Sequence, residues 1–233
     1  MRIGFVRAVE ILLIAGVDIE TCCNNGHKTP LIISAENGHD ATTRVLLDHG
    51  ANIKATDSRR LIALHGAVVS ENEVTIKLLL ERGANIEASG SNGWTPLHYA
   101  ASYGYESTTR LLLDRGADIN ARDNSQWTAL HRSAHLGHEA CTRLLLDRGA
   151  NIEAVDSSGW TVLHSAAVYG HHATIRQLLD HGANIDTADS NGWTALHRAV
   201  HHRHKATTRL LLDRGANIEA TDSSGWAALH RPA

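Results

Sequence analysis

The tryptophans of this chain recur at one fixed interval, and this periodicity constrains the fold more than any other feature. Seven leucines, from Leu31 to Leu229, and six glycines, from Gly50 to Gly215, follow the same 33-residue interval. The tryptophans are Trp94, Trp127, Trp160, Trp193 and Trp226. A fixed period of about 20 to 50 residues is the signature of a protein built from stacked structural repeats.

One period, residues 156–188, reads as a turn followed by two short helices. Its first residues, DSSG, favour a tight reversal of the chain, because Asp and Ser bond nearby backbone and Gly accepts a left-handed conformation. Thr161 then caps a helix that ends at Gly170, and a second helix ends at Gly182. One such pair cannot cover its own apolar face, so neighbouring pairs must stack. The predicted fold class is therefore all-α.

The residues after each turn resemble a known family. The segment TPLH at 95–98 is intact, and related forms occur as TALH at 128–131 and 194–197, TVLH at 161–164 and TPLI at 29–32. This pattern is similar to that of the ankyrin repeats. The resemblance implies a solenoid of stacked antiparallel helix pairs, with projecting β-turn fingers and a concave groove.

We expect the whole chain, 1–233, to form a single ankyrin-repeat array. Its predicted parts are a partial repeat 1–23, full repeats 24–56, 57–89, 90–122, 123–155, 156–188 and 189–221, and a partial repeat 222–233. The repeat 57–89 carries Arg60 and Leu61 in place of the turn glycine and tryptophan, so we expect its finger to be distorted. Apolar residues in the two partial repeats predict self-association, or a chain cut from a longer protein.

The family resemblance also implies which side chains face a partner. They lie beside the finger glycine, on the first helix and near its end: Trp94, Tyr99, Tyr103, Trp127, Arg132, His135, Trp160, Tyr169, Trp193, Arg198, His201 and His202. Leu136 belongs to the same surface. Trp, Tyr and Arg are the residues that dominate protein interfaces, so the tryptophans either grip a partner protein or only pack between fingers. The basic members favour a partner with acidic residues, bound more tightly below about pH 6.5.

Seventeen histidines suggest a metal site as a weaker alternative. His131 and His135, like His197 and His201, are four residues apart and share a helix face that zinc uses in other proteins. The first member of each pair belongs to the family's TxLH segment, where the resemblance implies a structural hydrogen bond, and no third ligand lies nearby. We therefore expect no metal and no cofactor.

No catalytic motif is present, so we expect no enzymatic activity. A basic row on the second helices, from Arg44 to Arg209, is matched by acidic residues four positions later, which predicts solvated ion pairs within each helix. Asn120 corresponds to the asparagine that hydroxylases modify in some ankyrin proteins, and hydroxylation is predicted there alone.

Composition limits the partners and the compartment. A net charge of -3 and a pI near 6.6 give no reason to expect a nucleic-acid partner, and no apolar run is long enough to span a membrane. Three cysteines without a CxxC pair fit a reducing compartment, the cytoplasm or alternatively the nucleus. The sequence thus predicts a non-catalytic scaffold or adaptor arm that binds a protein or peptide. The alternative is a regulatory segment of a larger enzyme, channel or signalling protein.

Overall fold

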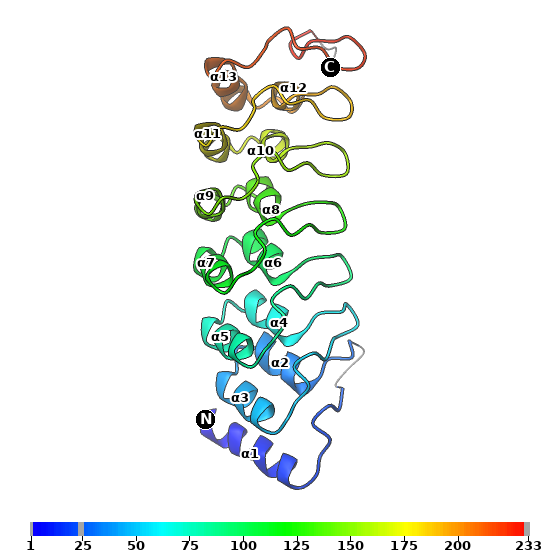
Figure 1. Cartoon of the computed structure of the whole chain (residues 1–233), viewed down its shortest axis with the longest axis vertical. Helices are drawn as coiled ribbons and strands as arrows, with labels where there is room; N and C mark the ends of the chain where they lie inside the picture. Colours follow the sequence, from blue (N-terminus) through cyan, green and yellow to red (C-terminus); the bar gives the residue numbers. More distant parts are fainter. Residues whose placement is uncertain (1, 23–25, 231–233) are drawn as a thin grey trace. The chain divides into compact units, whose positions relative to one another are not determined.

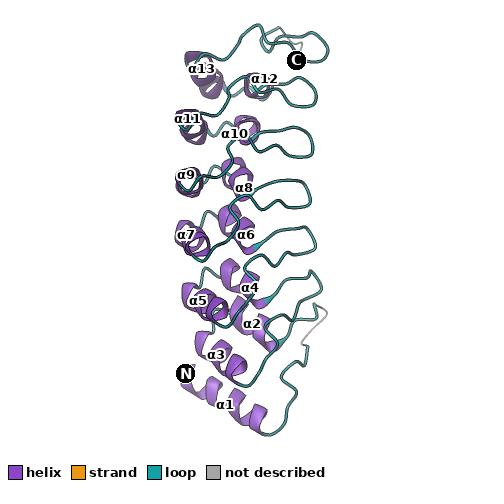
Figure 2. Ribbon diagram, in the orientation of Figure 1, coloured by secondary structure: helices purple, strands orange, loops and turns teal. Residues whose placement is uncertain are grey.

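The computed structural model describes residues 2–22 and 26–230, and its regular structure there is helical apart from isolated β-bridges such as Val155 with Thr161. Figure 2 shows the helices and the loops that join them. The helices are α1 (Arg2–Ile14), α2 (Pro30–Glu36), α3 (Asp40–Asp48), α4 (Ala63–Val69), α5 (Glu73–Glu81), α6 (Pro96–Tyr103), α7 (Glu106–Asp114), α8 (Ala129–His135), α9 (Glu139–Asp147), α10 (Val162–Tyr169), α11 (His172–Asp180), α12 (Ala195–His201) and α13 (Lys205–Asp213). The all-α prediction is confirmed.

The chain divides into two compact units. The first comprises the residues up to 100 together with 107–118, and the second comprises 101–106 and the residues from 119 onward. In the first unit α2 packs on α4, and the second helices α1, α3 and α5 pack in succession (Figure 1). The predicted start of the first full repeat, residue 24, lies outside the described residues. That all repeats form one array stays a prediction.

The second unit repeats the same arrangement. The first helices α8, α10 and α12 pack in one row, and the second helices α9, α11 and α13 pack in another (Figure 1). Each first helix also packs on the second helix that follows it. Every helix thus covers the apolar face of its neighbours, as the repeat pattern predicts.

The recurring leucine of each first helix forms the core of both units. It is at most 2% exposed at six of its seven positions, whereas Leu229 is 46% exposed. The six buried positions are Leu31, Leu64, Leu97, Leu130, Leu163 and Leu196. Burying one such side chain stabilises a fold by about 1.5 to 3 kcal/mol, so this one position accounts for much of the inter-repeat stability.

Each finger of the second unit is closed by the aspartate that begins it. In the second unit, Asp123 Oδ1 accepts the backbone N–H groups of Ser125 and Trp127 at 2.8 and 3.0 Å. The Asp123 N–H in turn donates to the Trp127 carbonyl at 2.9 Å. These bonds explain why Asp, which favours such local side-chain to backbone bonds, opens these turns.

The expected distortion of the 57–89 finger is wrong. Asp57 Oδ1 accepts from Arg59 and Leu61 at 2.8 and 2.9 Å, and its N–H donates to the Leu61 carbonyl at 2.9 Å, as in the other fingers. Arg60 takes the glycine's left-handed conformation, with φ of 62°, and Leu61 is buried where other repeats carry tryptophan. Gln126 replaces the same glycine in the 123–155 repeat of the second unit, and it also adopts a left-handed conformation, with φ of 64°.

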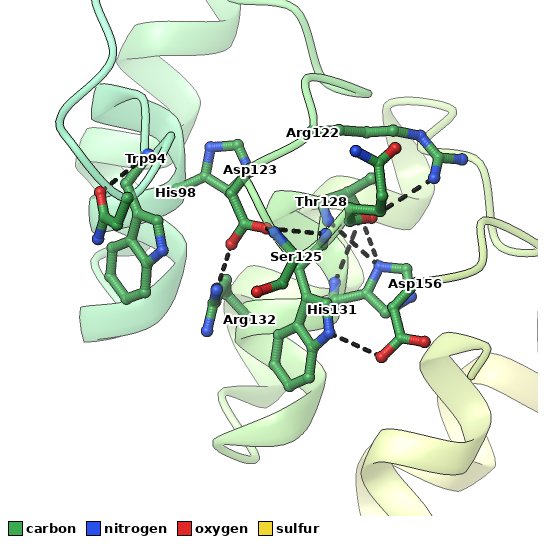
Figure 3. A network of polar contacts seen from close by, with 12 residues as sticks. Trp94, His98, Arg122, Asp123, Ser125, Thr128, His131, Arg132 and Asp156 are labelled. Atoms are coloured by element: carbon green, nitrogen blue, oxygen red, sulfur yellow. Dashed lines mark hydrogen bonds and ion pairs between the residues drawn. The ribbon is translucent and has the colours of Figure 1, made fainter. Parts of the chain in front are cut away.

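The TxLH histidines join successive repeats. His131 Nδ1 accepts the N–H of Thr128 at 3.3 Å (Figure 3). Its Nε2 donates to the carbonyl of Trp160, 29 residues later, also at 3.3 Å. Nδ1 is an acceptor here, so the ring is neutral with its proton on Nε2. His164 makes the same pair of bonds to Thr161 and to the Trp193 carbonyl. The structural role expected of these histidines is confirmed.

Candidate binding surface

The second unit exposes one side chain at the end of each first helix, at positions one repeat apart. Tyr103 is 49% exposed, Leu136 45% and Tyr169 51%, and His202 is also exposed. The four positions are separated by 33 residues, the repeat length. We call these four side chains the first-helix column. Exposed apolar and aromatic side chains in register mark an interaction surface when they gather in one place.

Three side chains of the first-helix column, Tyr103, Tyr169 and His202, each stack on a neighbouring ring. Tyr169 stacks on His171 with ring centroids 6.0 Å apart and planes 17° apart, and His202 stacks on His204 at 6.2 Å and 19°. His171 Nε2 bonds the His135 carbonyl at 2.9 Å. Tyr103 stacks on Tyr105 in the same way, at 5.4 Å and 18°. The column is therefore pre-organised, which lowers the entropy lost on binding.

The finger tryptophans of the second unit contact their own chain extensively. Trp193 is only 9% exposed, and Trp127 Nε1 donates to Asp156 Oδ2 of the next finger at 2.9 Å. Trp160 is half-buried, and Trp226 is 46% exposed. These contacts support packing as one role of the tryptophans, and leave only part of each ring for a partner.

The two arginines expected on this surface are ion-paired within their own repeats. Arg132 pairs with Asp123, and Arg198 pairs with Asp189; both aspartates are buried (Figure 3). The guanidinium of Arg198 also lies between two tryptophans, 4.1 Å from the Trp160 centroid and 4.4 Å from the Trp193 centroid. Each positive charge is balanced, so these arginines shape the surface more than they charge it.

Two histidines of the surface, His135 and His202, are harder to charge than the sequence suggests. Burial lowers the pKa of His135 below 6.5, and the positive charges of Arg132 and His171 lower it further. Burial also lowers the pKa of His202, with His201 and His204 adding to the effect. The gain of positive charge expected below about pH 6.5 is therefore displaced to lower pH at these two positions.

The other predicted site residues cluster around the same tryptophans. His135 meets Trp127 edge to face at 4.9 Å and Tyr169 at 4.4 Å, and His201 meets Trp193 at 5.1 Å. In the first unit, Trp94 and Tyr99 form a separate edge-to-face pair at 5.0 Å.

The histidine pairs do not form a metal-binding cluster. Among the described residues, no group of three or more His, Cys, Asp or Glu side chains lies close enough to hold an ion. Both ring nitrogens of His131 are committed to hydrogen bonds, and those of His197 bond Thr194 N–H and the Trp226 carbonyl. Each pair of histidines thus lacks a free nitrogen on its first member.

Asn120 is exposed, and its Oδ1 accepts the N–H of Asn151 at 2.9 Å. Its hydroxylation stays a prediction.

The charged residues of the second helices pair differently from the sequence-based prediction. Asp147 bonds His181 at 3.2 Å and Asp180 pairs with Arg214 at 2.7 Å, in both cases across 34 residues. The predicted pairs within one helix, Arg143 with Asp147 and Arg176 with Asp180, do not form in the described structure. Carboxylates near the end of one second helix instead pair with a basic side chain of the next repeat.

Helix pairs stacked through a leucine core, with hydrogen-bonded fingers between them, define a helical repeat protein. A family model described as ankyrin repeats in three copies matches residues 1–90, 59–123, 86–156, 118–189, 149–222 and 186–233. The chain belongs to the ankyrin repeat family.

Solved structures agree with this assignment. The chain is 29% identical to the ankyrin repeat domain of Bcl-3, described as a unique member of the IkappaB protein family, with a TM-score of 0.78 over 87% of this chain and 93% of that one. It is 28% identical to the human ASB11 ankyrin repeat domain, with a TM-score of 0.80 over 88% and 92%. No curated protein matches the sequence. The part of the chain that the structure describes holds no helix suited to crossing a membrane.

Proposed function

We propose that the chain is a non-catalytic protein-binding module that holds a partner protein or peptide on the first-helix column and the neighbouring fingers. The observation that carries this proposal is the exposure of Tyr103, Leu136 and Tyr169 at equivalent positions of successive repeats. The ankyrin repeat fold is typically used for protein–protein interaction, which supports the same class of function.

The chemistry of the surface favours a partner that offers apolar and aromatic side chains to the column. Aromatic anchors supply much of the affinity of protein interfaces, and rings already held in place lose little freedom on binding. In the second unit, Trp127, Trp160 and Trp193 would contribute the exposed parts of their rings as walls of the surface. In the first unit, Trp94 and Tyr99 would act similarly. The exposed histidines His201 and His202 give the surface its polar end, where acidic residues of a partner would bind.

We infer an intracellular setting, the cytoplasm or the nucleus, because the described cysteines Cys22 and Cys141 are not joined in a disulfide. The same surface would also serve a regulatory segment that binds a domain of its own polypeptide.

Quantitative affinity capture from a cell lysate tests the proposed function. The parent chain is compared with a column variant, Tyr103→Ala with Leu136→Ala and Tyr169→Ala. A control variant, Val74→Ala with Ile218→Ala, truncates exposed apolar residues outside the column, which are 55% and 42% exposed. All three chains are first shown to have the same helical content and melting temperature.

We expect the column variant to lose proteins that the parent and the control variant both retain. A lost protein is then purified, and its affinity for the three chains is measured directly. Equal capture by the parent and the column variant would contradict the proposed surface.

A further inference from the structure

A second surface, separate from the first-helix column, lies on the second helices. A groove between α11 and α13 is lined by polar and charged side chains from both helices, His172, Arg176, Lys205, Arg209 and Asp213, together with Ala206 and Leu210. Arg176, Lys205 and Arg209 carry permanent positive charges, against the single carboxylate of Asp213. The groove is therefore positive in a chain whose net charge is -3.

The positive charge of this groove is not neutralised by neighbouring acids. Asp180, four residues after Arg176, pairs with Arg214 instead. Within the described structure no ion pair is formed by Arg176 or Arg209. Arg176 Nη2 lies 3.1 Å from His172 Nε2 and donates to that ring nitrogen. The arginines are thus available to an outside carboxylate.

The sequence changes character at this end of the second unit. The first residue of each second helix is Glu106 in α7, Glu139 in α9, His172 in α11 and Lys205 in α13. A carboxylate is favourable at a helix N-terminus and a cation is unfavourable, because the helix dipole places partial positive charge there. Lys205 therefore reverses the electrostatically favoured choice.

A second unfavourable choice lies two residues earlier. Arg203 has φ of 61°, at the position where the preceding repeats carry Gly104, Gly137 and Gly170. A left-handed conformation is strained for a residue with a side chain. Both exceptions introduce positive charge at the start of α13, and departures from local preference tend to gather where a protein binds something.

We propose that an acidic peptide segment of a partner protein docks in the α11–α13 groove, with its carboxylates on Lys205, Arg209 and Arg176. The cations lie on two helices and are spread along the groove, which suits successive carboxylates of a peptide better than one small anion. Arginine adds directed, charge-assisted hydrogen bonds to carboxylates, and Lys205 adds a mobile point charge.

Fluorescence anisotropy with a labelled peptide of about ten glutamates tests the proposal at low ionic strength, where exposed charges are least screened. The groove variant is Lys205→Glu with Arg209→Gln. Lys205→Glu restores the residue type of Glu106 and Glu139 at a helix start, so this variant should fold normally. The matched control is Lys54→Glu with Arg44→Gln, which makes the same change in net charge at exposed positions in the first unit.

We expect the groove variant to bind the peptide at least about tenfold more weakly than the parent, and the control variant to bind within about twofold of it. A peptide of glutamines should not bind. The proposal is overturned by equal affinity in the parent and groove variant, or by an equal loss in the control, which would indicate only a response to net charge. Displacement of the peptide by equimolar inorganic phosphate, or tighter binding of a single-stranded oligonucleotide than of the peptide, would also overturn it.

Discussion

Arg198 lies against Trp160 of the preceding repeat, with its guanidinium carbon 4.1 Å from the ring centroid. The same side chain faces Trp193 at 4.4 Å and pairs with the buried carboxylate of Asp189. One arginine therefore connects two successive fingers through cation–π contacts and also neutralises a charge that has no access to water. Such a residue was expected on a binding surface, yet its contacts also give it a structural role.

Arg198→Ala should lower the free energy of unfolding by about 2 to 3 kcal/mol, since it leaves the Asp189 carboxylate buried without its cation and removes two ring contacts. The value lies below that of a fully buried pair because the Arg198 side chain is 13% exposed. Urea denaturation followed by circular dichroism measures it. Arg209→Ala, which removes an exposed arginine from α13, should change the stability by less than about 0.5 kcal/mol. Equal effects of the two substitutions would refute the structural role.

The repeat arrangement could be predicted from the sequence because it depends on spacing alone. A leucine every 33 residues, with a capping threonine before most first helices and a glycine after most helices, specifies the helix pairs, and Leu31, Leu64 and Leu97 are buried as expected. These features are local in sequence and are repeated many times. A single departure, such as Arg60 in place of glycine, is therefore held in the common conformation by the bonds of Asp57.

The site was harder to predict, because side-chain partners 29 to 36 residues apart are not visible in a local pattern. The pairing of Asp180 with Arg214 and the contact of Arg198 with Trp160 both join successive repeats. Reading the sequence by repeat columns predicts a binding surface, and the structure leaves some of its positions exposed, such as Tyr103 and Tyr169, and others buried, such as Trp193. The sequence pattern does not identify which charges are already neutralised, and this difference separates the first-helix column from the α11–α13 groove.

Trp127→Phe should lower stability while keeping most of the ring packing, because it removes the Nε1 donor to Asp156 at 2.9 Å. A hydrogen bond to a charged acceptor contributes about 1.5 to 3 kcal/mol, so we expect a loss near the lower value at this half-buried site. Thermal melts of Trp127→Phe and Trp226→Phe provide the comparison. Trp226 is 46% exposed, and its substitution should leave the melting temperature almost unchanged. An unchanged melting temperature for Trp127→Phe would show that the hydrogen bond to Asp156 does not stabilise the finger.

Stability should fall as pH drops below 6.5, because several histidines are neutral in the folded chain. Burial lowers the pKa of His131 from 6.5 to about 4, despite its bond to the Trp160 carbonyl, and burial lowers the pKa of His65 and His164 in the same way. The unfolded chain then binds more protons than the folded one between these pH values. The contribution is complete above pH 6.5 and is lost progressively toward pH 4.

For His131 alone, the loss is about 2 kcal/mol at pH 5. Urea midpoints measured between pH 8 and pH 5 test this sign. The variant His131→Gln should be less stable than the parent at pH 8, but should lose less stability between pH 8 and pH 5. A parent chain that is equally stable at both pH values would contradict the neutral, buried state of these rings.

Gln126 occupies a finger position that glycine fills in other repeats, so Gln126→Gly should increase stability. Its φ of 64° is in the left-handed region, where a side chain costs about 1 kcal/mol relative to glycine, and Gly159 takes the same place in the next finger with φ of 77°. The reverse substitution, Gly159→Ala, should destabilise the fold more than Gln126→Gly stabilises it, because it adds a steric clash to the strain. A Cβ at Gly159 would lie 2.9 Å from Ser190 Oγ and 3.0 Å from its backbone nitrogen, closer than side chains normally approach. If the melting temperatures of the two variants shift in opposite directions, backbone conformation, and not the side chain of Gln126, determines the stability of this turn. A lower melting temperature for Gln126→Gly would contradict this and would mean that the glutamine makes a compensating contact.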